Sequence, residues 1–217
     1  MLEDNYRHRG MRKALIRTLA EKGITHPEVL RVMEKVPRHF FFEKAFLEHA
    51  YQDKAFPIGE GQTISQPYTV AFQTQLLAPK PGDKVFEIGT GSGYQAAILA
   101  EMGVKLFTVE FNRHLYTRAS QLLLTQLRYN IKMYCGDGSV GLPVYAPFDK
   151  IIVTAGAPAV PKNLVDQLKI GGVLIIPVGN NEKQQMLRIT RAEDNKIIKE
   201  TFQIFSFVPL LGKNGWK

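Results

Sequence analysis

Apolar and polar residues alternate most regularly in the middle of the chain, over residues 84–180. Short apolar runs there are followed by longer segments in which apolar residues recur every three or four positions. This is the pattern of buried strands that alternate with amphipathic helices. It predicts strands at 84–88, 105–109, 131–135, 149–153 and 172–177, and helices at 94–101, 112–128 and 161–168. Elements in this order form a parallel sheet that helices cover on both faces.

The N-terminal part, residues 1–50, predicts helices instead of strands. Apolar residues recur at helical spacing up to Gly23, which is expected to stop the first helix. Pro27 lies in the first turn of a second helix, and Pro37 ends it. The aromatic run at 40–42 is expected to pack this helical cap onto the rest of the chain.

The segments on either side of the alternating region complete the expected fold. Residues 58–67 predict a polar loop, and 68–78 predict a helix. Near the C-terminus, 185–190 and 196–208 predict strands that pair antiparallel. The expected fold class is α/β, with a doubly wound, mostly parallel, Rossmann-like sheet, an N-terminal helical cap and antiparallel C-terminal strands.

Composition narrows the possible partners. Of the 217 residues, 45% are hydrophobic and 22% are charged, and no apolar run is long enough to cross a membrane. The formal net charge of +8 would suit an anionic partner, but the densest basic run, at 7–13, is expected to be a solvated helix face. We therefore expect neither nucleic acid nor a membrane as a partner.

The single cysteine, Cys135, lies in an apolar run and is expected to be a buried strand residue. One cysteine cannot form an internal disulfide, and the acidic, polar segment 1–5 does not resemble a secretory signal. These features predict a cytoplasmic protein. No histidine stands at ligand spacing from Cys135, so no metal site is expected.

The strongest local motif follows the first predicted strand. Segment 87–94 has the pattern E-x-G-x-G-x-G, with Glu87, Gly89, Gly91 and Gly93 at its fixed positions. A dinucleotide fingerprint that begins at Gly89 would need glycine where Tyr94 stands. A dinucleotide also brings a pyrophosphate, whereas S-adenosylmethionine brings a cationic sulfonium, which suits an acidic residue at the entry to the turn. The motif therefore favours S-adenosylmethionine.

Further carboxylates follow the next two strands. Glu110 can accept hydrogen bonds from both ribose hydroxyls, and Asp137 with Gly138 can present a carboxylate and a backbone amide to adenine. Parallel strands bring their carboxyl ends to one crevice, so Glu87, Glu110 and Asp137 are expected to converge on the cofactor. The structural alternatives are a strand-end cap for Glu87, a surface carboxylate for Glu110 and a plain turn for Asp137.

Several classes of methyltransferase carry motifs that are characteristic of their methyl acceptor, and this sequence lacks those motifs. Enzymes that act on the amines of bases carry paired prolines and an aromatic residue after the fourth strand, where this chain has 154–158 (TAGAP). Cytosine C5 enzymes need a Pro-Cys nucleophile, and Cys135 follows a tyrosine. No clear acidic metal-binding constellation of the catechol type is present.

A series of ordered segments between about residues 30 and 211 resembles the protein-L-isoaspartate (D-aspartate) O-methyltransferase family. The segments are VPRHF at 36–40 with AF at 45–46, GQTISQPY at 61–68, EIGTGSGY at 87–94, GDG at 136–138, APFD and IIVTA at 146–155, GG and IPVG at 171–179, and FVPL at 207–210. Leu211 stands where the family often has a polar residue, and the ending GKNGWK at 212–217 is unusual.

The resemblance implies an enzyme that transfers methyl from S-adenosylmethionine to the free α-carboxylate of L-isoaspartyl residues, leaving S-adenosylhomocysteine. The methyl ester would then collapse to a succinimide. Ser65 corresponds to the family's functional serine, although it could also cap the following helix. The other implied substrate contacts are Gln62, Thr63, Ile64 and Val208, while Glu87, Gly89, Gly91, Gly93, Glu110, Asp137 and Gly138 would hold the cofactor.

We expect one methyltransferase domain over 1–217, with a cap at 1–50, a substrate loop and helix at 51–80, and a cofactor-binding core with the C-terminal strands at 81–217. Isoaspartyl proteins and peptides are the expected partners, and the protein is expected to be a monomer. The alternatives are a nucleic-acid methyltransferase, a small-molecule methyltransferase and a non-enzymatic cofactor-binding module. Fold alone does not separate these interpretations.

Overall fold

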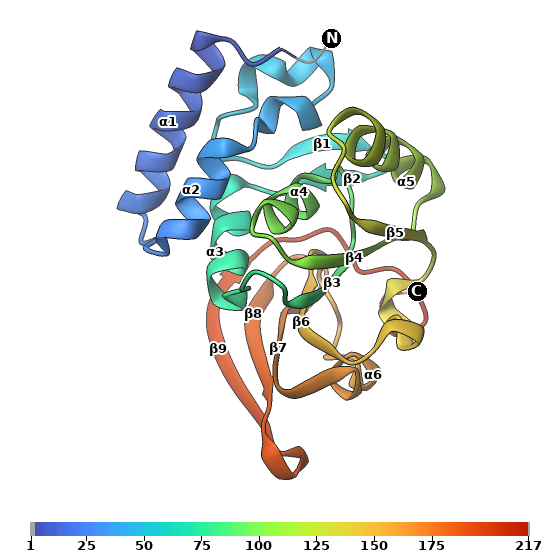
Figure 1. Ribbon diagram of the computed structural model, residues 1–217. Coiled ribbons are helices and arrows are strands. Elements are labelled where there is room, and N and C mark those ends of the chain that lie inside the picture. The colour runs from blue at the N-terminus through green and yellow to red at the C-terminus, as the bar shows by residue number, and fades with distance from the viewer. Residues whose placement is uncertain (1–2, 217) are drawn as a thin grey trace.

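The computed structural model describes residues 3–216 and has a seven-stranded sheet at its centre, in the order β5-β4-β3-β6-β7-β8-β9 (Figure 1). The strands of this sheet are β3 (Lys84–Ile88), β4 (Lys105–Glu110), β5 (Lys132–Cys135), β6 (Phe148–Val153), β7 (Leu168–Gly179), β8 (Gln184–Arg191) and β9 (Ile197–Phe205). The α-helices are α1 (Tyr6–Glu21), α2 (Pro27–Lys35), α3 (Pro67–Leu77), α4 (Tyr94–Glu101), α5 (Arg113–Ser120) and α6 (Lys162–Asp166).

The sheet has the mixed topology that the sequence predicts. β3 pairs in parallel with β4 and with β6, and the outer pairs β4–β5 and β6–β7 are parallel as well. β8 and β9 then add antiparallel strands at the other edge. The expected α/β fold, with a mostly parallel sheet and antiparallel C-terminal strands, is confirmed.

Successive residues of the central strands point to opposite faces, so the sheet separates two apolar cores. On one face Val85 and Ile152 pack among the side chains of α1 to α5. On the other face Phe86 and Ile151 pack toward Leu164 of α6. Buried on both faces, these strands have near-continuous apolar sequences, and this explains why they stand out in the sequence.

The N-terminal cap is fastened by a buried polar network. The guanidinium of Arg12 donates to both carboxylate oxygens of Asp4, at 3.0 and 2.9 Å, and to the Tyr51 hydroxyl at 2.9 Å. Arg12 therefore departs from the solvated basic face that the sequence predicts for 7–13. Asp4, His8 and His39 come close enough to hold a metal ion. However, Asp4 is already paired with Arg12, and His39 Nδ1 lies 2.7 Å from the Tyr51 hydroxyl.

Three local features differ from the sequence prediction. Residues 58–67 are not a plain loop, because β1 (Phe56–Gly59) and β2 (Gln62–Ile64) form a hairpin whose strands are too short to show periodicity. The predicted helix 112–128 changes to a π-helix, η3 (Gln121–Gln126), after α5. Cys135 is exposed because β5 is an edge strand that ends there. None of the helices in residues 3–216 is long and apolar enough to span a membrane.

Candidate active site

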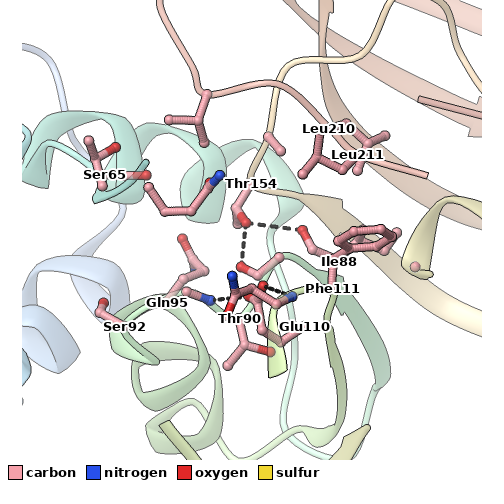
Figure 2. A pocket seen from close by; sticks show the side chains of 18 of the residues that line it. Ser65, Ile88, Thr90, Ser92, Gln95, Glu110, Phe111, Thr154, Leu210 and Leu211 are labelled. Carbon is pink, nitrogen blue, oxygen red and sulfur yellow. Dashed lines mark hydrogen bonds between the residues drawn. The ribbon is translucent and has the colours of Figure 1, made fainter. Parts of the chain in front are cut away.

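A cavity of about 370 Å³ opens at the carboxyl ends of β3, β4 and β6 (Figure 2). The turn after β3 and the end of β4 form one wall, which we call the cofactor wall. β2, Ser65 directly after it and residues 208–211 form the facing wall, which we call the substrate wall. The predicted site residues that line the cavity are Gln62, Thr63, Ile64, Ser65, Gly89, Gly91, Glu110, Gly138 and Val208. Glu87, Gly93 and Asp137 are not among the lining residues.

The glycine turn of the cofactor wall lies against the next loop of the sheet. Gly89 has a φ of +95°, and a Cβ on it would stand 2.6 Å from the Thr154 hydroxyl oxygen. That hydroxyl donates to the carbonyl oxygens of Ile88 and Gly89, at 3.0 and 2.6 Å. Only glycine tolerates both this conformation and this approach, so the motif builds a tight backbone cradle.

Glu110 ends β4 and is held by backbone groups on both of its oxygens. Oε2 accepts a hydrogen bond from the Gly91 N–H at 2.7 Å, and Oε1 accepts one from the Asn112 N–H at 2.9 Å. The carboxylate is thereby fixed in place before any ligand arrives. Each oxygen keeps a further lone pair that can accept a hydrogen bond from a ligand.

Two buried side chains near the turn carry acceptor oxygens that have no hydrogen-bond partner among the described residues. Glu87 is fully buried, and both of its carboxylate oxygens are unpaired. Burial raises the pKa of Glu87 to about 8: the nearby Thr108 hydroxyl opposes this shift, and the Glu110 carboxylate adds slightly to it. Gln95, which lines the cavity, donates from Nε2 to Thr74 Oγ1 at 3.0 Å, but its Oε1 is unpaired. An unpaired buried acceptor favours a hydrogen-bond donor, so Gln95 Oε1 is a candidate contact for a ligand in the cavity.

Asp137 follows β5 and is engaged on both oxygens. Oδ1 accepts a hydrogen bond from the Ser139 N–H, and Oδ2 accepts one from the Lys213 N–H, both at 2.8 Å. Burial alone would raise the pKa of Asp137, but these hydrogen bonds outweigh it and lower the pKa below its usual value. Asp137 is therefore an ionised carboxylate beside Gly138, which does line the cavity.

Ser65, on the substrate wall, is positioned by a residue from the N-terminal cap. The guanidinium of Arg38 donates from Nη2 to the Ser65 carbonyl oxygen at 2.8 Å and from Nε to the Ala50 carbonyl oxygen at 3.0 Å. Arg38 is completely buried, and its Cζ lies 4.6 Å from the centre of the Tyr94 ring. Burial lowers the pKa of Arg38 to about 10, so it remains a cation at neutral pH.

The Ser65 side chain is not a helix cap. α3 begins at Pro67, and the N-cap position is Gln66, which makes no side-chain cap bond. The N–H of Tyr68 in the first turn donates instead to Asp53 Oδ1 at 2.8 Å. The structural alternative for Ser65 therefore loses its basis. Figure 2 shows Ser65 and Glu110 at different sides of the cavity.

Comparison with known proteins agrees with this geometry. The family model described as protein-L-isoaspartate(D-aspartate) O-methyltransferase matches residues 10–215. This chain belongs to that family. Relatives named protein-L-isoaspartate O-methyltransferase include one from Cytophaga hutchinsonii, 55% identical over 99% of this chain and 97% of the relative. One from Flavobacterium psychrophilum is 54% identical over 97% of this chain and 98% of the relative.

Similar solved structures also belong to proteins named as protein-L-isoaspartate O-methyltransferases. A structure named protein-L-isoaspartate O-methyltransferase superposes with a TM-score of 0.83 and 28% identity, covering 94% of this chain and 66% of that one. A Plasmodium falciparum structure, described as a protein-L-isoaspartate O-methyltransferase in complex with S-adenosyl-L-homocysteine, has a TM-score of 0.79 and 26% identity, covering 96% and 99% of the two chains. The chain is an S-adenosylmethionine-dependent protein-L-isoaspartate methyltransferase that repairs damaged protein.

Some cavity residues of this isoaspartate methyltransferase were not anticipated from its sequence. They are Thr90, Gln95, Phe111, Thr154, Leu210 and Leu211. Phe111 carried a usable signal in the sequence, because it stands directly after Glu110, the predicted ribose contact, and the structure leaves its side chain 50% exposed. Thr154 and Leu210 lie in segments that resemble the family. Gln95 carried no signal, since a glutamine in a helix is ordinarily solvated.

Proposed function

We propose that Ser65 orients the acceptor carboxylate while the cofactor wall holds S-adenosylmethionine, so that the methyl group passes from one wall to the other. The observation that carries this proposal is that Ser65 and Glu110 line the same cavity from different sides. A cavity of about 370 Å³ is within the usual size of small-molecule sites.

Residues of the cofactor wall suit the parts of S-adenosylmethionine. Glu110, fixed by the N–H groups of Gly91 and Asn112, would accept hydrogen bonds from the ribose hydroxyls. The turn at Gly89 allows the ligand to approach the backbone. Glu87 does not line the cavity, and with a pKa of about 8 it is mostly protonated at neutral pH in the free protein. We assign it a supporting role: a cationic ligand at the glycine turn would favour its ionised form.

The adenine side would be formed by the turn after β5. Asp137 keeps a free lone pair on each oxygen, and Gly138 lines the cavity beside it. Phe111 is exposed at the same cavity and offers a flat apolar surface to a ring. When bound, S-adenosylmethionine supplies the electrophilic methyl group.

The acceptor is activated without a general base. The free α-carboxylate of an isoaspartyl residue has a pKa of about 4 and is therefore already an anion at neutral pH. The enzyme's task is to align a carboxylate oxygen with the methyl carbon, and alignment of this kind contributes up to about 7–11 kcal/mol. The Ser65 hydroxyl would donate to the other carboxylate oxygen and so fix its orientation. The methyl ester formed would then collapse to a succinimide outside the enzyme.

The peptide would lie in an adjoining groove that shares Thr63, Ser65 and Val208 with the cavity. The groove follows residues 203–208, where the chain leaves β9. Val208 has its carbonyl bound by the Gly156 N–H at 2.8 Å, which holds this segment in place. Gln62, Thr63 and Ile64 would contact the substrate from the β2 side. Recognition along a backbone accepts many sequences, as a repair enzyme requires.

We further propose that residues 1–217 act as one domain and as a cytoplasmic monomer, without nucleic-acid or membrane partners. One apolar core contains Leu15 of the cap, Ile64 of the substrate segment and Val85 of the cofactor-binding core, which favours a single cooperative unit. Cys135 is exposed, and a reducing compartment would protect its thiol from oxidation. Calorimetry should show one unfolding transition, and light scattering should give the monomer mass.

The decisive experiment supplies labelled S-adenosylmethionine with two matched peptides, one isoaspartyl and one normal aspartyl, and measures base-labile methyl ester. Label on the isoaspartyl peptide alone is the expected result. If neither peptide is labelled while the cofactor is bound, the acceptor assignment is wrong. In that case methylation of RNA, DNA and small molecules is assayed next.

A further inference from the structure

The last residues of the chain fold back onto the turn after β5. We call residues 212–216 the tail. The Lys213 N–H donates to Asp137 Oδ2 at 2.8 Å, and the Asn214 N–H donates to Ser139 Oγ at 3.0 Å. Asn214 Nδ2 also donates to the Ser139 carbonyl oxygen at 3.2 Å. In Figure 1 the C-terminus lies beside the segment that follows β5.

The glycines of the tail are required for this contact. Gly212 has a φ of +127°, and a Cβ on it would stand 2.1 Å from Asp137 Oδ1. A Cβ on Gly215 would stand 2.1 Å from the Leu210 carbonyl oxygen. Both distances are far below van der Waals contact, so a side chain at either position must displace the tail. The tail can therefore lie in this position only if residues 212 and 215 are glycine.

The far end of the tail is fastened to the loop after β6. The Trp216 N–H donates to the Leu210 carbonyl oxygen at 2.7 Å, and its indole Nε1–H donates to the Gly156 carbonyl oxygen at 2.9 Å. Gly156 in turn pairs with the backbone of Val208 and Leu210. The tail therefore bridges the turn after β5 and the loop after β6, two of the segments that surround the cavity.

We propose that the tail is a positioning element of the S-adenosylmethionine site, because it fixes the Asp137 carboxylate and the adjoining Gly138. One of the two bonds that orient this carboxylate comes from Lys213, and Ser139 is bound by Asn214. The proposal rests on the proposed role of the Asp137–Gly138 turn in holding adenine. Residues 212–216 would then act on cofactor affinity without touching the acceptor peptide.

Two full-length variants and one truncation test this. Gly212→Ala should displace the tail at Asp137, and a chain ending at Leu211 lacks the tail altogether. Gly23→Ala is the matched control, because Gly23 also has a positive φ of 93° but a Cβ there meets nothing within 4 Å. Asn214→Ala is a milder variant that removes only the side-chain bonds to the Ser139 carbonyl oxygen and to Asn163 Oδ1 of α6.

Calorimetry with S-adenosylhomocysteine should show a Kd raised about tenfold in Gly212→Ala and in the truncated chain, and less in Asn214→Ala. With saturating S-adenosylmethionine, kcat and the KM for an isoaspartyl peptide should match those of Gly23→Ala in Gly212→Ala and Asn214→Ala. The truncated chain also loses the Trp216 bonds to Leu210 and Gly156 at the substrate wall, so it is compared by its Kd alone. An unchanged Kd in all three tail variants would overturn the proposal. So would a fall in kcat together with a rise in the KM values for S-adenosylmethionine and for the peptide, because such a pattern indicates general misfolding.

Asp137→Ala separates this inference from the proposed function on which it rests. If Asp137→Ala weakens S-adenosylhomocysteine binding and the tail variants do not, the tail has no positioning role although the turn binds the cofactor. If Asp137→Ala leaves the Kd unchanged as well, the assignment of the turn to the cofactor is itself wrong.

Discussion

The two walls of the cavity are built in different ways. The cofactor wall is assembled from residues close in sequence to the strands that carry them: Gly91 and Asn112 both donate to Glu110 at the end of β4. The substrate wall is assembled from distant segments. Ser65 is held through Arg38 of the cap, and Val208 is held through Gly156 after β6.

With the roles proposed for the two walls, this difference predicts that cofactor binding and acceptor alignment have separate structural supports. The glycine turn of the cofactor wall is held by its own backbone, so replacing its glycines should weaken cofactor binding. The Ser65 segment of the substrate wall is held by the distant side chain of Arg38. Removing that side chain should therefore impair acceptor alignment, even though no residue of the segment itself has changed. Substitutions on the two walls should therefore affect different kinetic constants.

The largest effect is expected at the glycine turn. Gly89→Ala places a methyl group 2.6 Å from the Thr154 hydroxyl oxygen at a φ of +95°, so the turn must shift. We expect a cost of about 3 kcal/mol, which is about a 100-fold rise in the Kd for S-adenosylhomocysteine measured by calorimetry. Gly171→Ala is the control, because its φ is +78° and a Cβ there meets nothing within 4 Å. A Kd within about threefold of the control would contradict the proposal that the turn at Gly89 holds the cofactor.

Arg38→Met tests the support of the substrate wall. The substitution leaves the carbonyl oxygens of Ser65 and Ala50 without their donor, and we expect the free energy of unfolding to fall by about 3 kcal/mol in denaturant titrations. kcat/KM for an isoaspartyl peptide should fall about tenfold or more, with a smaller change in cofactor Kd. Arg31→Met, which removes an exposed ion pair with Glu28, is the control. If kcat/KM for the peptide and the affinity for the cofactor fell by the same factor, the two walls would not have separate supports.

Ser65→Ala tests the substrate wall at the hydroxyl that we propose orients the acceptor carboxylate. Loss of one hydrogen bond to a charged oxygen should raise the barrier by about 1–3 kcal/mol, seen as a lower kcat with cofactor binding unchanged. Ser65→Thr keeps a hydroxyl and should retain more activity than Ser65→Ala. A loss greater than about 10⁴-fold, with the cofactor still bound, would indicate a chemical role in place of an orienting one.

The same contrast explains what could be predicted from the sequence. The alternation of strands and helices along the chain, α4, the N-cap Asn112 and the glycine turn follow from patterns within a few residues, and the structure has them. The β1–β2 hairpin and the π-helix η3 were missed because short strands and a local change of helix type leave no periodic signal. The roles of Arg38 and of the tail were also missed. Arg38 lies 27 positions before Ser65, and only tertiary packing reveals such contacts.

The smallest effect concerns the charge of Glu87 close to the cofactor wall. Its pKa is about 8 in the folded protein and 4.5 as the ordinary value, so between these limits the folded state binds a proton that the unfolded state has lost. The free energy of unfolding should therefore fall as pH rises, by about 1 kcal/mol from pH 6 to pH 7. Glu87→Gln removes the titrating group and should remove this slope. Identical pH profiles of the free energy of unfolding for the two proteins would show that folding does not raise the pKa of Glu87, and that Glu87 is ionised at neutral pH before the cofactor binds.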